Sequence, residues 1–253
     1  HFISEVPFKK ILIHGLIKDS EGIKMSKSKG NTLDPLDIID GINLTKLSAK
    51  RTEGLMQPQM KERIEKQTKK DFPEGISAYG TDALRLTFCS LATGGRDVNF
   101  DMKRVEGYRN FCNKLWNASR FIEMQIESYG ISEELNEDLT EKWINYKFNL
   151  TVKKVNDAFD SFRFDLATKA IYEFIWYEFC DWYIELSKIK LSKEGEDNSR
   201  IVKSMVNLLE KTLRLAHPIM PFITEEIWIH FKPFHQKPEK SIMIAKTPKH
   251  KEN

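Results

Sequence analysis

Lysines and serines are concentrated in the segment 24–29, near the start of the chain. Lys24 and Lys27 lie three positions apart, so their two ammonium groups can converge on a polyphosphate. The hydroxyls of Ser26 and Ser28 add hydrogen-bond donors, and Gly30 allows the backbone to bend sharply directly after them. These residue types predict a loop that binds phosphate groups, with a merely solvated basic loop as the alternative.

An apolar segment, Phe8 to Ile17, comes before this loop. It contains Ile11 and Ile13 with little polar relief, a pattern typical of a buried strand in a parallel sheet. One strand cannot form a sheet, and the chain opens on His1 without an initiator Met or a signal-peptide pattern. We therefore expect a fragment, with most of the sheet upstream of it.

Residues that typically start or end helices follow the loop. Asp34 and Pro35 predict the N-cap and the first position of a short helix that ends at Gly41. Residues 44–70 are polar and helix-prone, and their charged stretch favours a solvated face over an RNA contact. The turn at 72–75 predicts a linker, so we expect one unit over residues 1–75 and a second over residues 76–253.

The second unit is expected to be a helical bundle, because its apolar residues recur with helical spacing almost without interruption. Thr81 or Asp82 is expected to cap its first helix, and Asp82 and Arg85 have the spacing of a local ion pair. Further helices are predicted over 101–127, 138–160, 164–190, 197–216 and 219–231. The helix 164–190 is apolar nearly all round, with Leu166 and Trp182 included, and should be central. His217 is expected to be structural, and the lysine-rich tail 232–253 extended or frayed.

The helix 101–127 carries two different faces. One is an apolar core stripe made of Phe111, Leu115, Ala118 and Ile122. The other combines guanidinium groups, amides and an indole, which can contact phosphates and unpaired bases of RNA. Its members are Arg109, Asn113, Trp116, Asn117 and Arg120. The alternative is that Trp116 belongs to the core and that the arginines pair with Glu106 and Glu123.

Composition limits the remaining function classes. The 253 residues are 40% hydrophobic and 30% charged, and no apolar run is long enough to cross a membrane, so we expect a cytoplasmic globular protein. The net charge of +3 neither requires nor excludes a nucleic-acid partner. Cys89, Cys112 and Cys180 lie far apart, which predicts buried thiols and no metal site.

Several motifs resemble one enzyme family. Lys-Met-Ser-Lys-Ser followed by Lys-Gly-Asn at 24–31 is similar to the second ATP signature of the class I aminoacyl-tRNA synthetases. Residues 36–41, 95–101, 104–121, 217–222 and 241–244 resemble the valyl-tRNA synthetases within that class, so the resemblance covers essentially the whole chain. The stretch 104–121, with Arg-Asn-Phe-Cys-Asn-Lys-Leu-Trp-Asn, is long and specific. Gly-Thr-Asp-Ala-Leu-Arg at 80–85 is similar to the element before the helical domain of that class and reads as a structural hinge.

The resemblance implies a mainly α fold: the C-terminal remnant of a Rossmann-type catalytic domain with the lysine loop in 1–75, and an antiparallel anticodon-binding bundle with a basic tail in 76–253. It implies an enzyme that activates valine with ATP and transfers it to tRNA(Val), with Lys27 stabilising developing phosphate charge. Mg2+ is expected only through the nucleotide, and a monomer is expected. The implied ATP-binding residues are Lys24, Met25, Ser26, Lys27 and Ser28. The implied tRNA-binding residues are Arg109, Asn113, Asn117, Arg120 and Phe121.

The first class I signature, His-x-Gly-His, is absent from these residues, since His14-Gly15 is followed by Leu16. The amino-acid pocket and the editing domain of the family also have no counterpart, so this chain alone is expected to be inactive. Two alternatives stay open: a fragment of an isoleucyl- or leucyl-tRNA synthetase, or a stand-alone helical RNA-binding module without catalysis.

Overall fold

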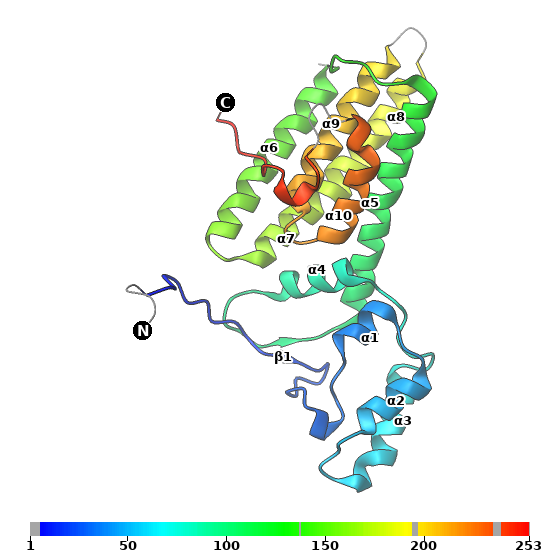
Figure 1. Cartoon of the computed structure of the whole chain (residues 1–253), viewed down its shortest axis with the longest axis vertical. Coiled ribbons are helices and arrows are strands. Elements are labelled where there is room, and N and C mark those ends of the chain that lie inside the picture. Colours follow the sequence, from blue (N-terminus) through cyan, green and yellow to red (C-terminus); the bar gives the residue numbers. More distant parts are fainter. Residues whose placement is uncertain (1–5, 137, 194–196, 235–238, 253) are drawn as a thin grey trace.

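The computed structural model describes residues 6–136, 138–193, 197–234 and 239–252 (Figure 1). The chain is mainly helical, as expected, with an upright bundle above a smaller lower part. The lower part and its junction contain β1 (Ile17–Lys18), η1 (Lys27–Lys29), α1 (Pro35–Asp40), α2 (Leu44–Thr52), η2 (Pro58–Met60), α3 (Lys61–Asp71), α4 (Thr81–Leu91) and β2 (Val98–Asn99). The bundle and its tail contain α5 (Met102–Tyr129), α6 (Leu139–Asp160), α7 (Phe164–Glu173), η3 (Phe174–Ile184), α8 (Glu185–Leu191), α9 (Asn198–Ala216), α10 (Pro221–Phe231), η4 (Lys232–Phe234) and η5 (Ile242–Ile244).

Short polar side chains cap the first turns of α1, α2, α5 and α6. Asp34 accepts a hydrogen bond from the backbone N–H of Leu36 at the start of α1, as predicted, and Pro35 occupies the first position of that helix. Asp101 and Asp138 cap α5 and α6 in the same manner. Each cap satisfies a backbone donor that the first turn of a helix leaves without a partner.

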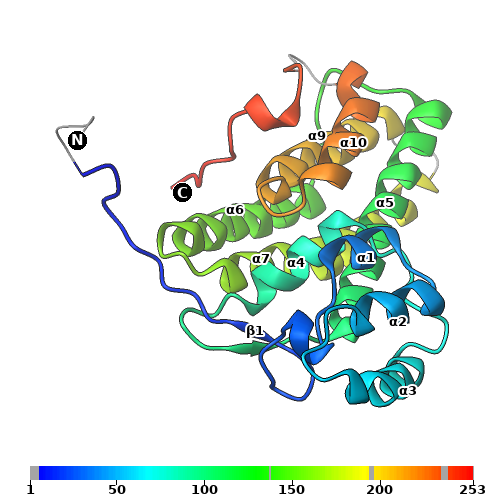
Figure 2. The same ribbon diagram turned by 60° about the horizontal axis from the view of Figure 1, so that its bottom comes forward.

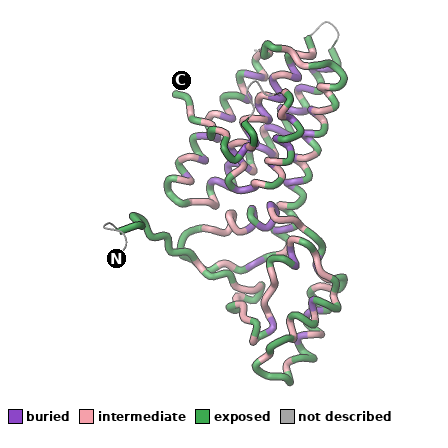
Figure 3. The backbone as a smooth tube through the Cα atoms, in the orientation of Figure 1, coloured by how far each residue is buried: buried purple, intermediate pink, exposed green. Residues whose placement is uncertain are grey.

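The bundle surrounds one large core, and its buried positions form an inner column along the helices (Figure 3). The predicted helix 164–190 runs as α7, a π-helical segment η3 and α8, and Phe174 and Phe179 are buried in it. Trp182, however, is 61% exposed and Leu166 is 45% exposed, so the expectation that both are core residues was wrong. Trp182 lies in the π-helix, which bonds i to i+5 and so shifts the buried stripe away from the positions that a 3.6-residue period selects; Leu166 lies in α7, before that segment.

The apolar segment before the lysine loop is not a buried strand. Ile11 is 90% exposed and Ile13 is 76% exposed, and of this segment only Ile17 enters a strand. In β1, Ile17 and Lys18 pair in parallel with Val98 and Asn99 of β2. A strand buries its side chains only where neighbouring strands or helices cover it, and in the described residues β1 has just this two-residue partner.

Within its described residues, the predicted tail contains the short 3-10 segments η4 and η5, and its end, residues 246–252, is extended but not frayed. Its residues 235–238 and 253 lie outside the described ranges. Asn149 of α6 holds the tail from both sides, because its amide donates to the carbonyl of Lys251 and its Oδ1 accepts from the N–H of Lys251. Arg214 of α9 donates to the carbonyl of Lys246 at 2.6 Å, and Ser241 donates to Glu225 at 2.7 Å. The tail therefore lies along the bundle beside α6 and α9.

The lower part packs beneath the bundle, as the turned view shows (Figure 2). α4 contacts α5 and α7 above it and α1 below it, and a second, smaller core includes Ile38, Leu84 and Val105. No helix in the described ranges is long and apolar enough to cross a membrane.

Candidate phosphate loop and nucleic-acid face

The lysine loop is a short 3-10 turn with a fixed base. Its backbone is held by Asn31, whose Oδ1 accepts from the N–H of Ser26 at 2.9 Å and whose amide donates to Asp19 at 2.8 Å. The hydroxyls of Ser26 and Ser28 lie 2.7 Å apart. Lys24 and Lys27 are exposed, so the loop presents two solvent-facing ammonium groups on a hydrogen-bonded frame.

Gly30 joins this loop to the helices below it. Its φ of +66° is in the left-handed region, and a Cβ there would lie 2.6 Å from the carbonyl oxygen of Arg51 and 2.6 Å from Ile64. The Arg51 guanidinium donates through Nε to the carbonyl of Gly30 at 2.9 Å and through a terminal nitrogen to Thr68 at 3.1 Å. Burial lowers the pKa of Arg51. Close backbone approach therefore requires glycine at this position.

A cavity of about 460 Å³ opens beside Lys27, between the loop, α1 and α2. Two carboxylates that line it, Asp34 and Asp37, both pair with Lys50, at 3.4 and 2.6 Å. The ionisable lining is balanced, with Lys27, Lys50 and Arg51 against Asp34, Asp37 and Glu53, so Lys27 lies at the edge of a cavity without a net charge. Within the described ranges, no group of three or more His, Cys, Asp or Glu side chains could hold a metal ion.

The predicted RNA face of α5 is exposed at Arg109, Asn113, Asn117 and Arg120. Arg109 donates to the carbonyl of Ala78, and Arg120 pairs with Glu123 at 3.7 Å. Trp116 is half-buried against the core and meets the His230 ring edge-on. The Lys188 ammonium lies 5.1 Å from the centre of the half-buried Phe121 ring.

These predicted residues form two separate sets. The lysine loop belongs to the lower part and most of the α5 face to the bundle, and the two are not brought into one pocket. Of the cysteines, Cys112 and Cys180 are buried, and burial raises the pKa of each thiol to about 12. Cys89 is only half-buried, so the prediction of a buried thiol was wrong there, because α4 lies at the edge of the bundle.

Asp82 and Arg85 do not form the predicted local pair. The Asp82 carboxylate accepts the backbone N–H groups of Phe222 and Ile223, at 3.3 and 2.6 Å, at the start of α10. Arg85 donates to the carbonyls of Pro218 and Ile219. Burial raises the pKa of Asp82, and those two N–H groups oppose the rise. The N-cap of α4 is Gly80 rather than Thr81 or Asp82, because Asp82 caps a helix 140 residues away.

His217 is a structural residue, as expected. Its Nδ1 lies 2.8 Å from the hydroxyl of Thr224, next to the clamp formed by Asp82 and Arg85. Burial lowers the pKa of His217. This group of contacts joins the lower part to the α9–α10 connection.

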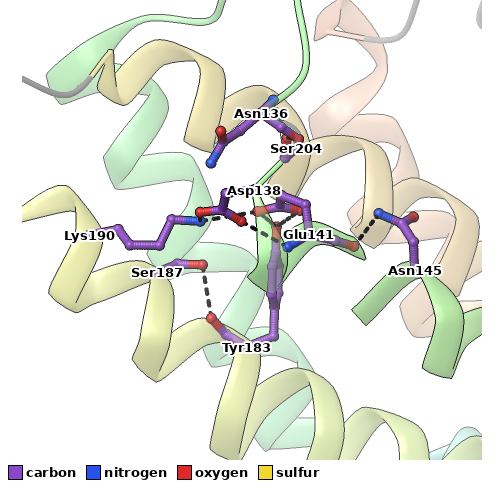
Figure 4. Close-up of polar contacts among 8 residues, drawn as sticks. All are labelled: Asn136, Asp138, Glu141, Asn145, Tyr183, Ser187, Lys190 and Ser204. Atoms are coloured by element: carbon purple, nitrogen blue, oxygen red, sulfur yellow. Dashed lines mark hydrogen bonds and ion pairs between the residues drawn. The ribbon is translucent and has the colours of Figure 1, made fainter. Parts of the chain in front are cut away.

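A buried polar cluster near the upper end of the bundle was not foreseen (Figure 4). Glu141 of α6 is 3% exposed, and the Tyr183 hydroxyl donates to both of its carboxylate oxygens at 3.0 Å. Lys190 of α8 lies 2.7 Å from Asp138 and 3.5 Å from Glu141. Burial raises the pKa of Glu141 to about 7. The residues come from two stretches, 138–141 and 183–190, and Glu141 and Tyr183 are 42 positions apart, so no local spacing in the sequence signals the cluster.

Two family models match the chain. The model described as "tRNA synthetases class I (I, L, M and V)" matches residues 1–101, and that described as "Anticodon-binding domain of tRNA ligase" matches residues 141–253. Among curated proteins, the valine–tRNA ligase of Acinetobacter baylyi is 52% identical over 250 residues. That match covers 96% of this chain but 26% of the relative, so the chain spans about a quarter of the length of that protein.

Solved structures give the same architecture. The ternary LeuRS-tRNA-LeuAMS complex of Agrobacterium radiobacter K84 agnB2 aligns with 94% of this chain and 23% of its own, at a TM-score of 0.59 and 17% identity. Methionyl-tRNA synthetase of Mycobacterium tuberculosis, in complex with methionyl-adenylate, aligns with 85% of this chain and 36% of its own, at a TM-score of 0.58 and 16% identity. At these identities the likeness establishes the fold alone.

Proposed function

Because this chain belongs to the class I aminoacyl-tRNA synthetases and corresponds to part of a valine–tRNA ligase, we propose that it serves valine activation and transfer to tRNA(Val). The observation that carries the proposal is the 52% identity with a valine–tRNA ligase over 96% of the chain. This identity favours the valyl enzyme over an isoleucyl or leucyl one and over a module without catalysis.

We propose that the lysine loop binds the ATP phosphates in the complete enzyme. Lys24 and Lys27 would approach the phosphates as charges, and Met25, Ser26 and Ser28 would complete the contact. Lys27 would act by positioning and by electrostatic stabilisation of the charge that develops on the phosphates, without a covalent step on the protein. Mg2+ would arrive with the nucleotide, since Asp34 and Asp37 in the adjacent cavity are already paired with Lys50.

We propose that the α5 face binds the anticodon stem and loop of tRNA(Val). The exposed guanidinium and amide groups can contact phosphates and base edges, and the Phe121 ring can stack on a base. The proposed contacts are Arg109, Asn113, Asn117, Arg120 and Phe121. Arg109 already donates to the carbonyl of Ala78, so its contact would use the remaining guanidinium donors.

The proposed division of labour places residues 1–75 in the catalytic domain and residues 76–253 in the anticodon-binding domain. The clamp of Asp82 and Arg85 would hold α4 to the α9–α10 connection within the second domain, and α4 in turn contacts α1 of the first. We propose a cytoplasmic monomer, and no aminoacylation by this chain alone.

Fluorescence anisotropy tests the RNA assignment. The chain should prefer transcribed tRNA(Val) over the same tRNA with a scrambled anticodon and over an isoleucine tRNA, and the preference should persist when salt is raised. Arg120→Gln should reduce this preference. Arg104→Gln is the matched control, because Arg104 is also exposed on α5 but lies about 160° around the helix from Arg120. Equal, salt-sensitive binding to all three RNAs would refute recognition by this face.

A further inference from the structure

A second cavity, of about 510 Å³, lies between α6, α9 and the C-terminal tail. It is remote from the lysine loop, and α6 and α5 stand on opposite sides of the bundle (Figure 1). Contributions come from Lys142 and Tyr146 of α6, from Lys211 of α9 and from residues 247–251 of the tail. It is thus a site distinct from the two assigned above.

The charge of its lining is one-sided. The ionisable residues that line it, tyrosine apart, are all basic: Lys142, Lys211, Arg214, Lys249 and Lys251. Among the described residues, only Arg214 of these five forms an ion pair, with Glu210 at 2.8 Å. Four lysines therefore line one space, and none of them has a carboxylate within 4.0 Å of its ammonium group in the described part of the chain.

The folded structure holds these cations together against their repulsion. Asn149 fixes the backbone of Lys251 through two hydrogen bonds, and Arg214 fixes the carbonyl of Lys246. Lys211 is half-buried; burial lowers its pKa, the positive charge of Lys251 lowers it further, and the nearby carboxylate of Glu210 opposes this. Lys211 and Arg214 are half-buried and the other three cations are exposed, and a group of cations held by the fold around one cavity can bind a phosphate group with charge-assisted hydrogen bonds.

An aromatic ring lies at the same cavity. Tyr146 is 51% exposed on α6, where the buried positions of that helix are occupied by residues such as Phe148 and Val152. A half-exposed ring beside a cationic cavity can stack on the base of a nucleotide whose phosphate is bound there.

We propose that this cavity is a phosphate-binding site that takes a nucleotide, with Lys211, Lys249 and Lys251 around the phosphate and Tyr146 against the base. The nucleotide is either free in solution or part of an RNA strand, and both sources share this chemistry. The site does not depend on the function proposed above, since neither the lysine loop nor the α5 face contributes to it.

Two-dimensional amide NMR of the full 253-residue chain tests the proposal. AMP, pyrophosphate and a short single-stranded oligoadenylate are titrated separately, and shifts of amides in 142–152 and 246–251 distinguish this site from the loop at 24–30. Saturation by AMP would assign the site to a free nucleotide. Saturation by the oligoadenylate without saturation by AMP would assign it to an RNA strand. Absence of saturable shifts at these amides with all three probes would overturn the proposal.

Pairs of variants test which residues of the cavity bind the ligand. Lys211→Gln should weaken binding of the saturating probe about 10-fold or more, because one charge-assisted contact is lost. Lys203→Gln on the same helix, about 12 Å further along its axis, should leave the affinity unchanged. Tyr146→Leu should weaken binding of the base-containing probe about 10-fold and leave pyrophosphate binding unchanged, whereas Tyr146→Phe should retain both. Unchanged affinity in Lys211→Gln, with the native unfolding midpoint retained, would overturn the assignment.

Discussion

The buried carboxyl of Glu141 makes a quantitative prediction about how the stability of the bundle depends on pH. Its ordinary pKa is 4.5, and burial raises the pKa in the folded protein to about 7. The folded state therefore holds this proton more tightly than the unfolded state does. Its contribution to stability is complete below about pH 4.5 and is lost as pH rises through about 7.

The magnitude follows from linkage. A pKa difference of one unit corresponds to about 1.4 kcal/mol, so this group removes about 2 to 3 kcal/mol from the free energy of unfolding between about pH 5 and about pH 8. Glu141→Gln should abolish that loss, because the amide resembles the protonated acid and does not titrate. The Tyr183 hydroxyl can still donate to the amide oxygen, and Lys190 retains Asp138 at 2.7 Å.

Urea unfolding of the native chain and of Glu141→Gln, measured across this pH range, isolates the effect. Subtracting the free energy of unfolding of one protein from that of the other, at each pH, removes the contribution of every titrating group that the substitution leaves unchanged. Tyr183→Phe is the second variant: it removes a hydrogen bond that lowers the pKa of Glu141, and should move the midpoint of the loss to higher pH. Parallel pH profiles for the native chain and Glu141→Gln would refute the reasoning.

Three further perturbations test other parts of the fold and site. Asp82→Ala should lower the free energy of unfolding by about 2 kcal/mol, because two N–H groups at the start of α10 lose their acceptor; Asp82→Asn should cost less in the same urea titration. Gly30→Ala should destabilise the lysine loop and speed its limited proteolysis, since a Cβ would lie 2.6 Å from a backbone oxygen. Gly94→Ala is the control, because Gly94 also has a positive φ but open space around it, so that only backbone strain acts there. Equal losses of stability in the two variants would contradict a steric clash at Gly30. Lys27→Ala in the complete ligase should slow adenylate formation by about 10²- to 10³-fold, measured by pyrophosphate exchange, with Lys29→Ala as the neighbouring control; an unchanged rate would remove the assignment.

Local signals in the sequence were sufficient for the helices and their ends. Asp34 with Pro35 starts α1 and Gly41 ends it, as predicted, because caps and prolines act on the backbone beside them. The core stripe Phe111, Leu115 and Ile122 is buried for a similar reason: side chains at helical spacing share a face whatever packs against it. The motif order at 24–31 indicated the family, which the comparisons confirmed.

Local signals in the sequence could not predict which side chains are exposed or which residues distant in the chain contact each other. Ile11 and Ile13 have the composition of a buried strand yet lie in the open, because coverage depends on elements distant in the chain. Trp182 is exposed because the π-helical segment changes the period on which the sequence reading relied.

The sequence by itself determined the class of fold and the positions of most helices, and it indicated a candidate phosphate loop, since these depend on residues close together in the chain. Tertiary structure alone decided that Asp82 reaches α10, that Glu141 is buried beside Lys190, and that the lysines of α6, α9 and the tail face one cavity. Those pairings bring together residues that are tens to more than a hundred positions apart. Packing sets such distances, and with them the desolvation and charge that shift a pKa or create a binding site.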